Sequence, residues 1–178
     1  GLGLALWRFV RNGVMGRFAR AVARVLHVRR LARWRPALTL NRPILWILHA
    51  AYAWIPVGLG LLALAQIGLV PVSTGVHALA VGATGGLIIG MITRTARGHT
   101  GRPLKASNTE VLAYALVMTA AVLRVLLPLI SPGLLGVSLI AAAVGWSAAF
   151  LIYLWQFTPW LMSTRLDGMI EPTITGFL

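Results

Sequence analysis

The sequence predicts an all-α fold: a polytopic transmembrane bundle of four full spans, preceded by the tail of an earlier helix. The first observation is composition, because 58% of the 178 residues are hydrophobic and the mean hydropathy is +0.84. The second is charge layout, since ten of the sixteen basic residues lie at positions 8–42 and four at 94–105. Long uncharged stretches separated by basic loops are typical of membrane spans.

The net charge of +13 does not indicate a nucleic-acid partner. A nucleic-acid binder gathers its basic residues on one folded face, whereas here they gather in two segments between apolar runs. The same layout argues against a disordered basic tail. Cysteine is absent, which excludes a disulfide scaffold and thiolate metal ligands. Three acidic residues leave little material for catalysis by paired carboxylates.

Residues 1–42 are expected to hold the end of a preceding transmembrane helix and a basic cytoplasmic amphipathic loop. The chain starts at Gly1 with an apolar run, so we expect it to be a piece of a longer membrane protein whose N-terminal half is its partner. After this run, three arginines share one helical face and three apolar residues share another: Arg17, Arg20, Arg24 and Phe18, Val22, Val25. This pattern favours a helix on the anionic cytoplasmic leaflet. An ordinary cytoplasmic loop with positive charge is the plainer alternative.

Residues 43–178 are expected to form four spans and a cytoplasmic C-terminal tail. The spans are predicted at 43–65, 76–93, 111–130 and 134–155, because roughly 20 apolar residues cross the hydrocarbon core. Pro56 predicts a kink in the first span. In the second, Gly82, Gly86 and Gly90 repeat every four residues, which favours a closely packed neighbour, for which the alanine-rich fourth span is a candidate.

The charge of the loops predicts the orientation of the spans. The basic segments 8–42 and 94–105 lie on one side after two crossings, and the turns 66–75 and 131–133 on the other side carry no charge. Basic loops are retained in the cytoplasm, so the basic side is predicted to be cytoplasmic. The intervening stretch, 94–110, is the most polar of the chain and is predicted to be a loop.

His77 and Arg124 are predicted to share a depth near the non-cytoplasmic side of the membrane. An ionisable side chain inside a span indicates a functional site by default. Since no acidic residue is expected at that depth, Arg124 requires an anion from elsewhere. This anion is either a carboxylate from the missing part of the protein or a cofactor group such as a haem propionate, with His77 as the iron ligand. The alternatives are a hydrogen bond from His77 to a neighbouring helix and snorkelling of Arg124 to the interface.

His49 and His99 are predicted to lie near the opposite, cytoplasmic side. His49 is in the first turns of its span, and His99 is in the predicted cytoplasmic loop. Each is a candidate metal ligand, although two histidines alone make a weak site, and a hydrogen-bonded histidine is the alternative for both. His27 lies among arginines, whose charge opposes a bound cation, so it is predicted to be solvated.

The residues themselves resemble a known family. The run RPILWILHAAYAW at 42–54, followed by HALAVGATGGLIIGMITRTARGHTGRPL at 77–104, resembles the NnrS family of bacterial inner-membrane proteins, which are linked to nitric oxide and described as containing haem and copper. LRV at 123–125 and PWLMSTRLDG at 159–168 extend the match. The resemblance covers residues 34–168 and corresponds to the C-terminal part of the family's polytopic chain, while the tail 169–178 matches nothing.

The resemblance implies a haem- and copper-binding protein of the nitric oxide response, with nitric oxide or iron–nitrosyl species as small partners. The implied cofactor-binding residues are His77, Arg124, Arg94 and Arg102, and the implied metal ligands are His49, His77 and His99. Nitric oxide reduction is not expected, because the chain lacks a cluster of histidines and carboxylates. The alternative function is a cofactor-free transporter or channel-like protein, in which His77 and Arg124 line a polar path.

Overall fold

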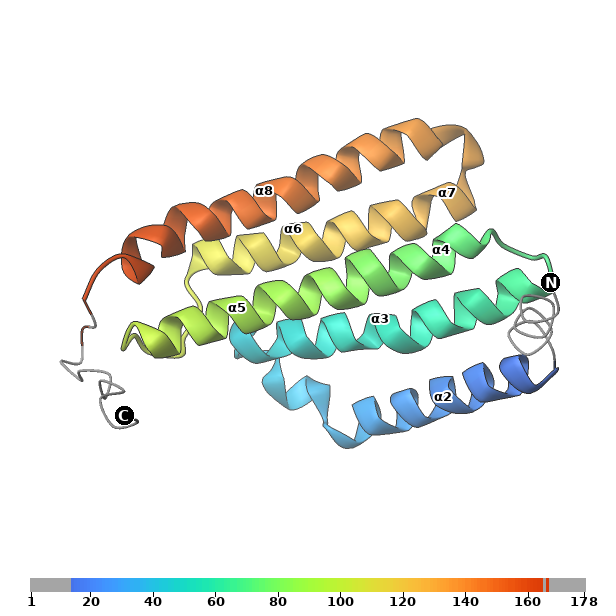
Figure 1. Cartoon of the computed structure of the whole chain (residues 1–178), viewed down its shortest axis with the longest axis horizontal. Coiled ribbons are helices and arrows are strands. Elements are labelled where there is room, and N and C mark those ends of the chain that lie inside the picture. Colours follow the sequence, from blue (N-terminus) through green and yellow to red (C-terminus); the bar gives the residue numbers. More distant parts are fainter. Residues whose placement is uncertain (1–13, 165, 167–178) are drawn as a thin grey trace, which may run out of the picture.

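The computed structural model describes residues 14–164 and Leu166 (Figure 1). Over these residues the chain is helical and forms no strand. Four helical segments are long and apolar enough to cross a membrane: Pro43–Gln66, Val72–His99, Asn108–Ile130 and Pro132–Leu161. The predicted all-α membrane bundle is therefore confirmed. The helix tail expected at 1–10 lies outside the described residues.

The spans are built from several helical elements. In chain order these are α2 (Val14–Arg33), η1 (Pro36–Thr39), α3 (Pro43–Gln66), α4 (Val72–His77), η2 (Ala78–Gly85), α5 (Gly86–His99), α6 (Asn108–Val125), α7 (Leu127–Ile130), η3 (Pro132–Leu134) and α8 (Leu135–Leu161). The element η2 is a π-helix that joins α4 and α5 into one span. The helix α3 continues through Pro56.

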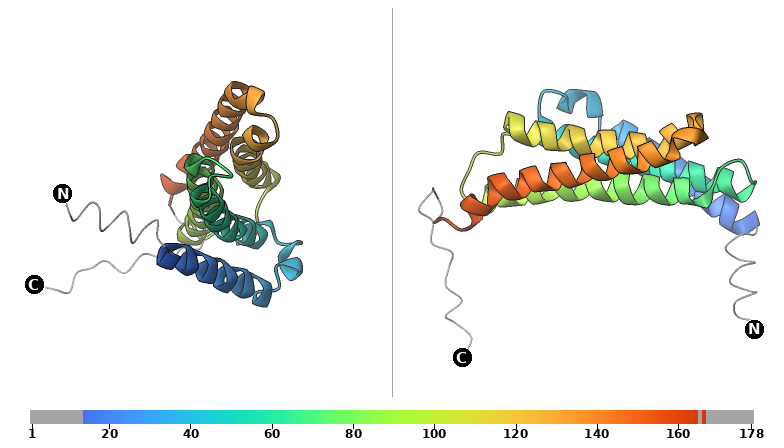
Figure 2. Two further views of the ribbon diagram at one scale, coloured as in Figure 1. Left: turned by 90° about the vertical axis from the view of Figure 1, so that its right-hand side faces the viewer. Right: turned by 90° about the horizontal axis from the view of Figure 1, so that it is seen from above.

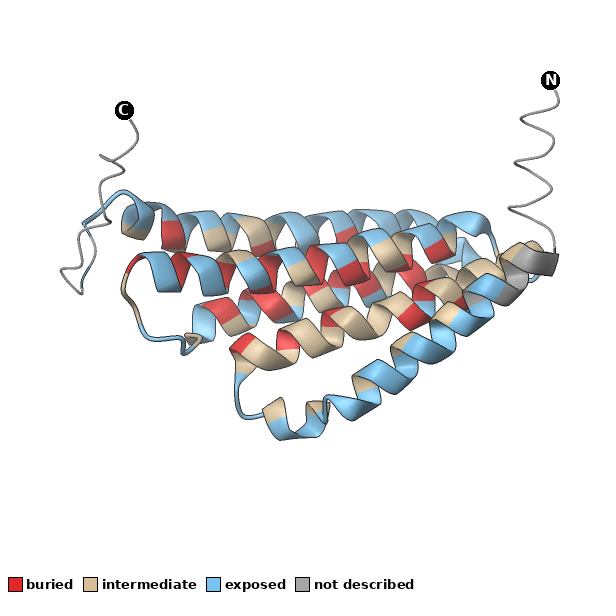
Figure 3. Ribbon diagram, turned by 60° about the horizontal axis from the view of Figure 1, so that its bottom comes forward, coloured by how far each residue is buried: buried red, intermediate tan, exposed pale blue. Residues whose placement is uncertain are grey.

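The helices lie side by side, and α5 is central because it contacts α3, α6 and α8 (Figures 1 and 2). Buried residues line the facing sides of these helices (Figure 3). Ile47, Ile89, Tyr114 and Val117 are fully buried in this core. The outer surface is apolar, as on α8, where Trp155 is 86% exposed. Apolar side chains facing outward are expected where the solvent is lipid.

The glycine stripe of the second span packs against α3, so the predicted neighbour was wrong. A Cβ atom added at Gly82 would collide with the ring of Trp54, and one added at Gly86 would lie 2.7 Å from the Cβ of Ala51, both on α3. The residue that faces α8 is Gly85, which is outside the stripe and lies against Trp146. Spacing predicts that a small-residue face will be packed closely, but not by which helix.

The polar stretch 94–110 is partly helical, contrary to the loop predicted there. The helix α5 continues to His99 and ends beside Gly101, whose φ of 67° favours glycine. The helix α6 begins at Asn108, after a capping box in which Ser107 and Glu110 bond each other's backbone N–H. Hydropathy predicts only the part of a helix that lies in the hydrocarbon core. The helices α5 and α6 continue into the polar stretch, so their ends could not be predicted from hydropathy.

A buried ion pair joins the ends of three helices next to this loop. Arg97 of α5 donates from Nε to Oε1 of Glu110 at 2.7 Å and from Nη2 to Oε2 at 2.5 Å. Its Nη1 donates to the Pro103 carbonyl at 2.9 Å, so the guanidinium also holds the loop. The guanidinium carbons of Arg97 and Arg102 lie 5.3 and 4.3 Å from the ring centre of Trp160, which brings in the end of α8.

The basic helix α2 packs along α3 at the edge of the bundle (Figure 2). Its Arg24 side chain lies against Gly60. Its His27 Nδ1 is 2.6 Å from the hydroxyl of Tyr52. The charge of α2 keeps it out of the four candidate spans, and its predicted place on the cytoplasmic leaflet stays a prediction.

Gly82→Ala should destabilise the bundle, because the added methyl group meets the Trp54 ring. Overpacking of this kind costs about 1–3 kcal/mol. We expect a lower midpoint of thermal unfolding in detergent. Gly98→Ala is the matched control, since a Cβ atom there meets nothing within 4 Å. Equal midpoints for the two variants would contradict the packing assigned to Gly82.

Glu110→Gln should destabilise the protein more strongly, by about 3–5 kcal/mol, because it leaves the buried Arg97 charge without a counter-charge. The measurement is again thermal unfolding in detergent. The double variant Arg97→Gln/Glu110→Gln removes both charges and should recover part of the loss. A double variant less stable than Glu110→Gln alone would show that the unpaired charge is not the cause.

Candidate functional site

His77 and Arg124 meet at the end of the bundle where α4 begins and α6 ends. His77 is the last residue of α4, and Arg124 lies in the last turn of α6. The Nη2 of Arg124 is 2.8 Å from Nε2 of His77. Both side chains are half-buried. The structure thus brings together the two residues that were expected to share a depth.

The hydrogen bonds of His77 define its tautomer. Nδ1 lies 2.6 Å from the Ser73 carbonyl oxygen, one turn earlier in α4. A carbonyl can only accept, so Nδ1 carries the proton. The guanidinium of Arg124 has only donors, so Nε2 accepts from it. The imidazole is therefore neutral and oriented from both sides. Ser73 contributes through its backbone, which residue spacing alone did not reveal.

Two pockets adjoin this pair. The first, of about 380 Å³, is lined by both side chains together with Pro71, Pro128 and Pro132 among others. The second, of about 290 Å³, reaches Arg124 from the α8 side, where it is lined by Trp146. Ligand pockets in proteins span roughly 300–1,000 Å³. Arg124 belongs to both pockets, so its guanidinium faces space that a small or flat ligand can enter.

The backbone on either side of the pair is irregular. The π-helix η2 starts directly after His77. π-Helical turns are often found at functional sites, since they shift side chains relative to a regular helix. Directly after Arg124, α6 ends at Val125, and the short helix α7 follows, which holds Pro128 and ends at Ile130. These proline-containing turns wall the larger pocket.

His49 and His27 lie on either side of an aromatic group between α2 and α3. His49 Nδ1 is 3.0 Å from the Leu45 carbonyl, and its ring is 5.9 Å from that of Trp34. The Trp34 ring is 4.9 Å from Tyr52, the residue that bonds His27. The prediction that His27 is solvated was wrong, because His27 is half-buried and hydrogen-bonded. No spacing signalled this contact, which depends on how α2 packs.

The remaining predicted site residues lie at the other end of the second span. Arg94 and His99 are exposed on α5. The side chain of His99 makes no hydrogen bond, ion pair or ring contact with any described residue, His49 included. Arg102 stacks on Trp160. Within residues 14–164, no three side chains among histidines and carboxylates gather as a metal centre. The metal-ligand assignments of His49, His77 and His99 stay predictions.

The ion pair of Arg97 and Glu110 was not anticipated as a feature of the sequence. Its one sequence signal was the Ser107-to-Glu110 spacing, which is that of a capping box. The pair is 8% and 2% exposed, and its donors and acceptors are used within the protein. It therefore stabilises the bundle and offers no site to a ligand.

Comparison with known proteins identifies the family. The family model described as NnrS protein matches residues 1–165. Neither the curated proteins nor the solved structures return a match. The match spans nearly the whole chain, all four candidate membrane spans and the pair of His77 and Arg124. This chain is a multi-pass membrane protein that belongs to the NnrS family.

Proposed function

We propose that this chain is part of a haem- and copper-binding protein of the bacterial inner membrane that acts in the response to, or tolerance of, nitric oxide. In this proposal the basic loops face the cytoplasm, and the protein binds its cofactors without an assigned catalytic reaction. Family membership supports the proposal. The observation that carries it is the pair of His77 and Arg124, which lines a pocket between the spans and has no carboxylate partner among the described residues.

The donor groups at this pocket fit a haem. With the proton on Nδ1, His77 offers the lone pair of Nε2, which is the tautomer required of a metal-ligating histidine, and the Ser73 carbonyl orients the ring. Arg124 would hold a propionate, because a guanidinium binds carboxylates through strong, charge-assisted hydrogen bonds. Haem would supply an iron centre able to bind nitric oxide. A porphyrin also provides four nitrogens, so a single protein imidazole suffices.

The chain's own residues have defined tasks in this proposal. His77 would ligate the haem iron, and the Ser73 carbonyl holds its ring in place. Arg124, which bonds Nε2 of His77 in the structure, provides the positive charge for an acidic group. The turns that contain Pro128 and Pro132 line the pocket. Arg94 and Arg102, at the opposite end of the span, stay proposed cofactor-binding residues, where a guanidinium would hold an acidic group and not the copper ion.

The intact protein should show a haem Soret band that changes in His77→Ala and in Arg124→Ala. We expect a shifted or lost band in the first variant. In the second we expect about tenfold to hundredfold weaker haem binding, since a hydrogen bond to a charged group is lost. Optical titration with haem measures both. His99→Ala, at the far end of the same span, is the control and should leave the band unchanged. Wild-type spectra for both variants would overturn the assignment of the pair.

Copper would use His49 and His99, together with ligands from outside the described residues. A single accessible imidazole is a weak copper ligand, so removing one of two should release the metal. Metal analysis of the purified intact protein should therefore show less copper in His49→Ala and in His99→Ala, with haem content unchanged. Copper retained in full by both variants would exclude these histidines as ligands.

The second candidate function is a cofactor-free transporter or channel-like protein. The π-helix η2 favours it, because transporters place binding sites at irregular segments of membrane helices. His77 and Arg124 would then line a polar path for an anion. A colourless, metal-free preparation that moves anions across vesicle membranes would support this candidate and contradict the first.

A further inference from the structure

Three arginines near the end of α2 have no counter-charge within the described part of the chain. Arg29, Arg30 and Arg33 are exposed, and none of them donates a hydrogen bond to a described residue. Glu110 is the one acidic residue in that part, and Arg97 uses both of its oxygens. These three guanidinium groups are therefore open to a ligand.

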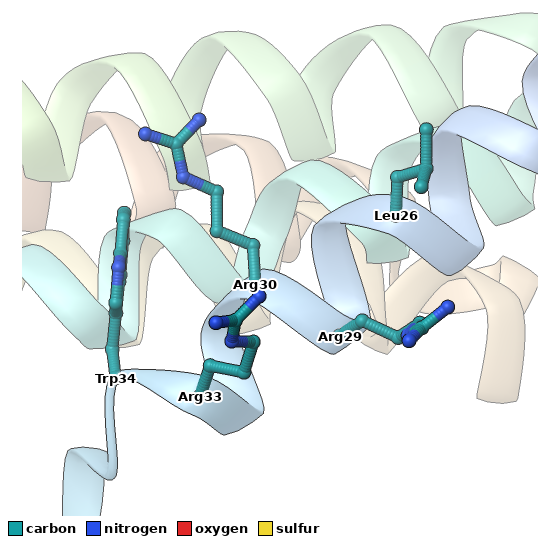
Figure 4. Close-up of a pocket in the computed structure, with 5 residues that line it drawn as sticks. All are labelled: Leu26, Arg29, Arg30, Arg33 and Trp34. Atoms are coloured by element: carbon teal, nitrogen blue, oxygen red, sulfur yellow. The ribbon is translucent and has the colours of Figure 1, made fainter.

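The three arginines line an open pocket of about 600 Å³ together with Leu26 and Trp34, and in Figure 4 the Arg30 side chain lies beside the Trp34 ring. The Arg30 guanidinium carbon lies 5.0 Å from the ring centre of Trp34. The indole of Trp34 also packs against the ring of Tyr52 on α3, with 4.9 Å between the ring centres. One wall of the pocket is thus fixed by packing against α3.

The chemistry of this pocket selects a phosphate-bearing anion. Three like charges within five residues repel one another, and an anion among them relieves that repulsion. Planar guanidinium groups donate in pairs and match the oxygens of phosphate. A phosphate offers several acceptor oxygens at once, so one group can bond more than one of these arginines.

The surroundings of the pocket indicate that the phosphate carries acyl chains. Exposed apolar side chains lie on the same helix as the arginines, among them Val25 at 56% and Leu26 at 58%. A free phosphate ion would leave these apolar side chains exposed, whereas the acyl chains of a phospholipid would cover them. We propose that Arg29, Arg30, Arg33 and Trp34 form a binding site for the headgroup of an anionic phospholipid. The site is independent of the pocket at His77.

The test is lipid binding by the intact protein in detergent, measured by native mass spectrometry with phosphatidylglycerol and phosphatidylcholine as probes. We expect phosphatidylglycerol to bind at least about tenfold more tightly, because each arginine near a membrane surface adds affinity for anionic lipid. The triple variant Arg29→Gln/Arg30→Gln/Arg33→Gln should lose this preference. The control variant Arg35→Gln/Arg42→Gln/Lys105→Gln removes the same charge from exposed positions outside the pocket and should keep it.

Several outcomes would overturn the site. Equal loss in the two triple variants would show diffuse attraction to charge. Competition by inorganic phosphate alone at millimolar concentration would assign the pocket to a free anion. Unchanged preference in the pocket variant would place lipid binding elsewhere. If the triple variant does not fold, as judged by thermal unfolding, Arg29→Gln and Arg33→Gln are tested singly, and each should weaken phosphatidylglycerol binding by severalfold.

Discussion

The scarcity of carboxylates is the constraint on which the rest of this structure depends. The sequence has three acidic residues, and Glu110 is the one that lies in the described part. Both of its carboxylate oxygens accept hydrogen bonds from Arg97. A buried charge is costly unless it is paired and hydrogen-bonded. The pair with Arg97 meets this condition and ties α5, α6 and the loop between them. Trp160 extends the same contact to α8. Among the described residues, no second acid is left to pair with the other arginines.

Arg124 shows what that requirement does inside a span. A guanidinium in hydrocarbon needs acceptors, and its depth offers no carboxylate among the described residues. The neutral imidazole of His77 supplies one acceptor, while the positive charge stays uncompensated. On α2 the solution differs, because the arginines lie on the outer face of the bundle, where ions, water and headgroups are within reach. Arg124 and the arginines of α2 therefore both favour an anion because neither has an acidic partner in the described part of the chain. The anions differ in kind, because Arg124 lies in a pocket at the end of a span and the α2 arginines lie on the outer face.

The sequence predicts well those features that depend on composition, and poorly those that depend on partners. The four spans follow from apolar runs, since each must cross the same thickness of hydrocarbon. The neighbour of Gly82 does not follow, because a small-residue face fits any helix, and it is Trp54 of α3 that fills it. The role of His27 also escapes prediction, since its bond to Tyr52 exists only once α2 packs on α3. At the candidate site, the sequence predicts that His77 and Arg124 share a depth but not that they hydrogen-bond each other, and the Ser73 carbonyl lacks any signal in side-chain identity.

The bond between Arg124 and His77 also explains how a site can exist before its ligand. A guanidinium bonded to a neutral imidazole gains one hydrogen bond and no counter-charge, whereas a carboxylate adds Coulombic attraction and can accept two parallel hydrogen bonds. An anionic group entering the pocket therefore competes favourably for Arg124, and the lone pair of Nε2 on His77 is then exposed. Because the Ser73 carbonyl still holds Nδ1, the ring keeps its tautomer and orientation through the exchange. A carboxylate in place of His77 would instead neutralise Arg124 and leave the pocket with no preference for an anion. Because no acid of the described residues lies at this depth, the positive charge of Arg124 stays available to an anion that enters the pocket.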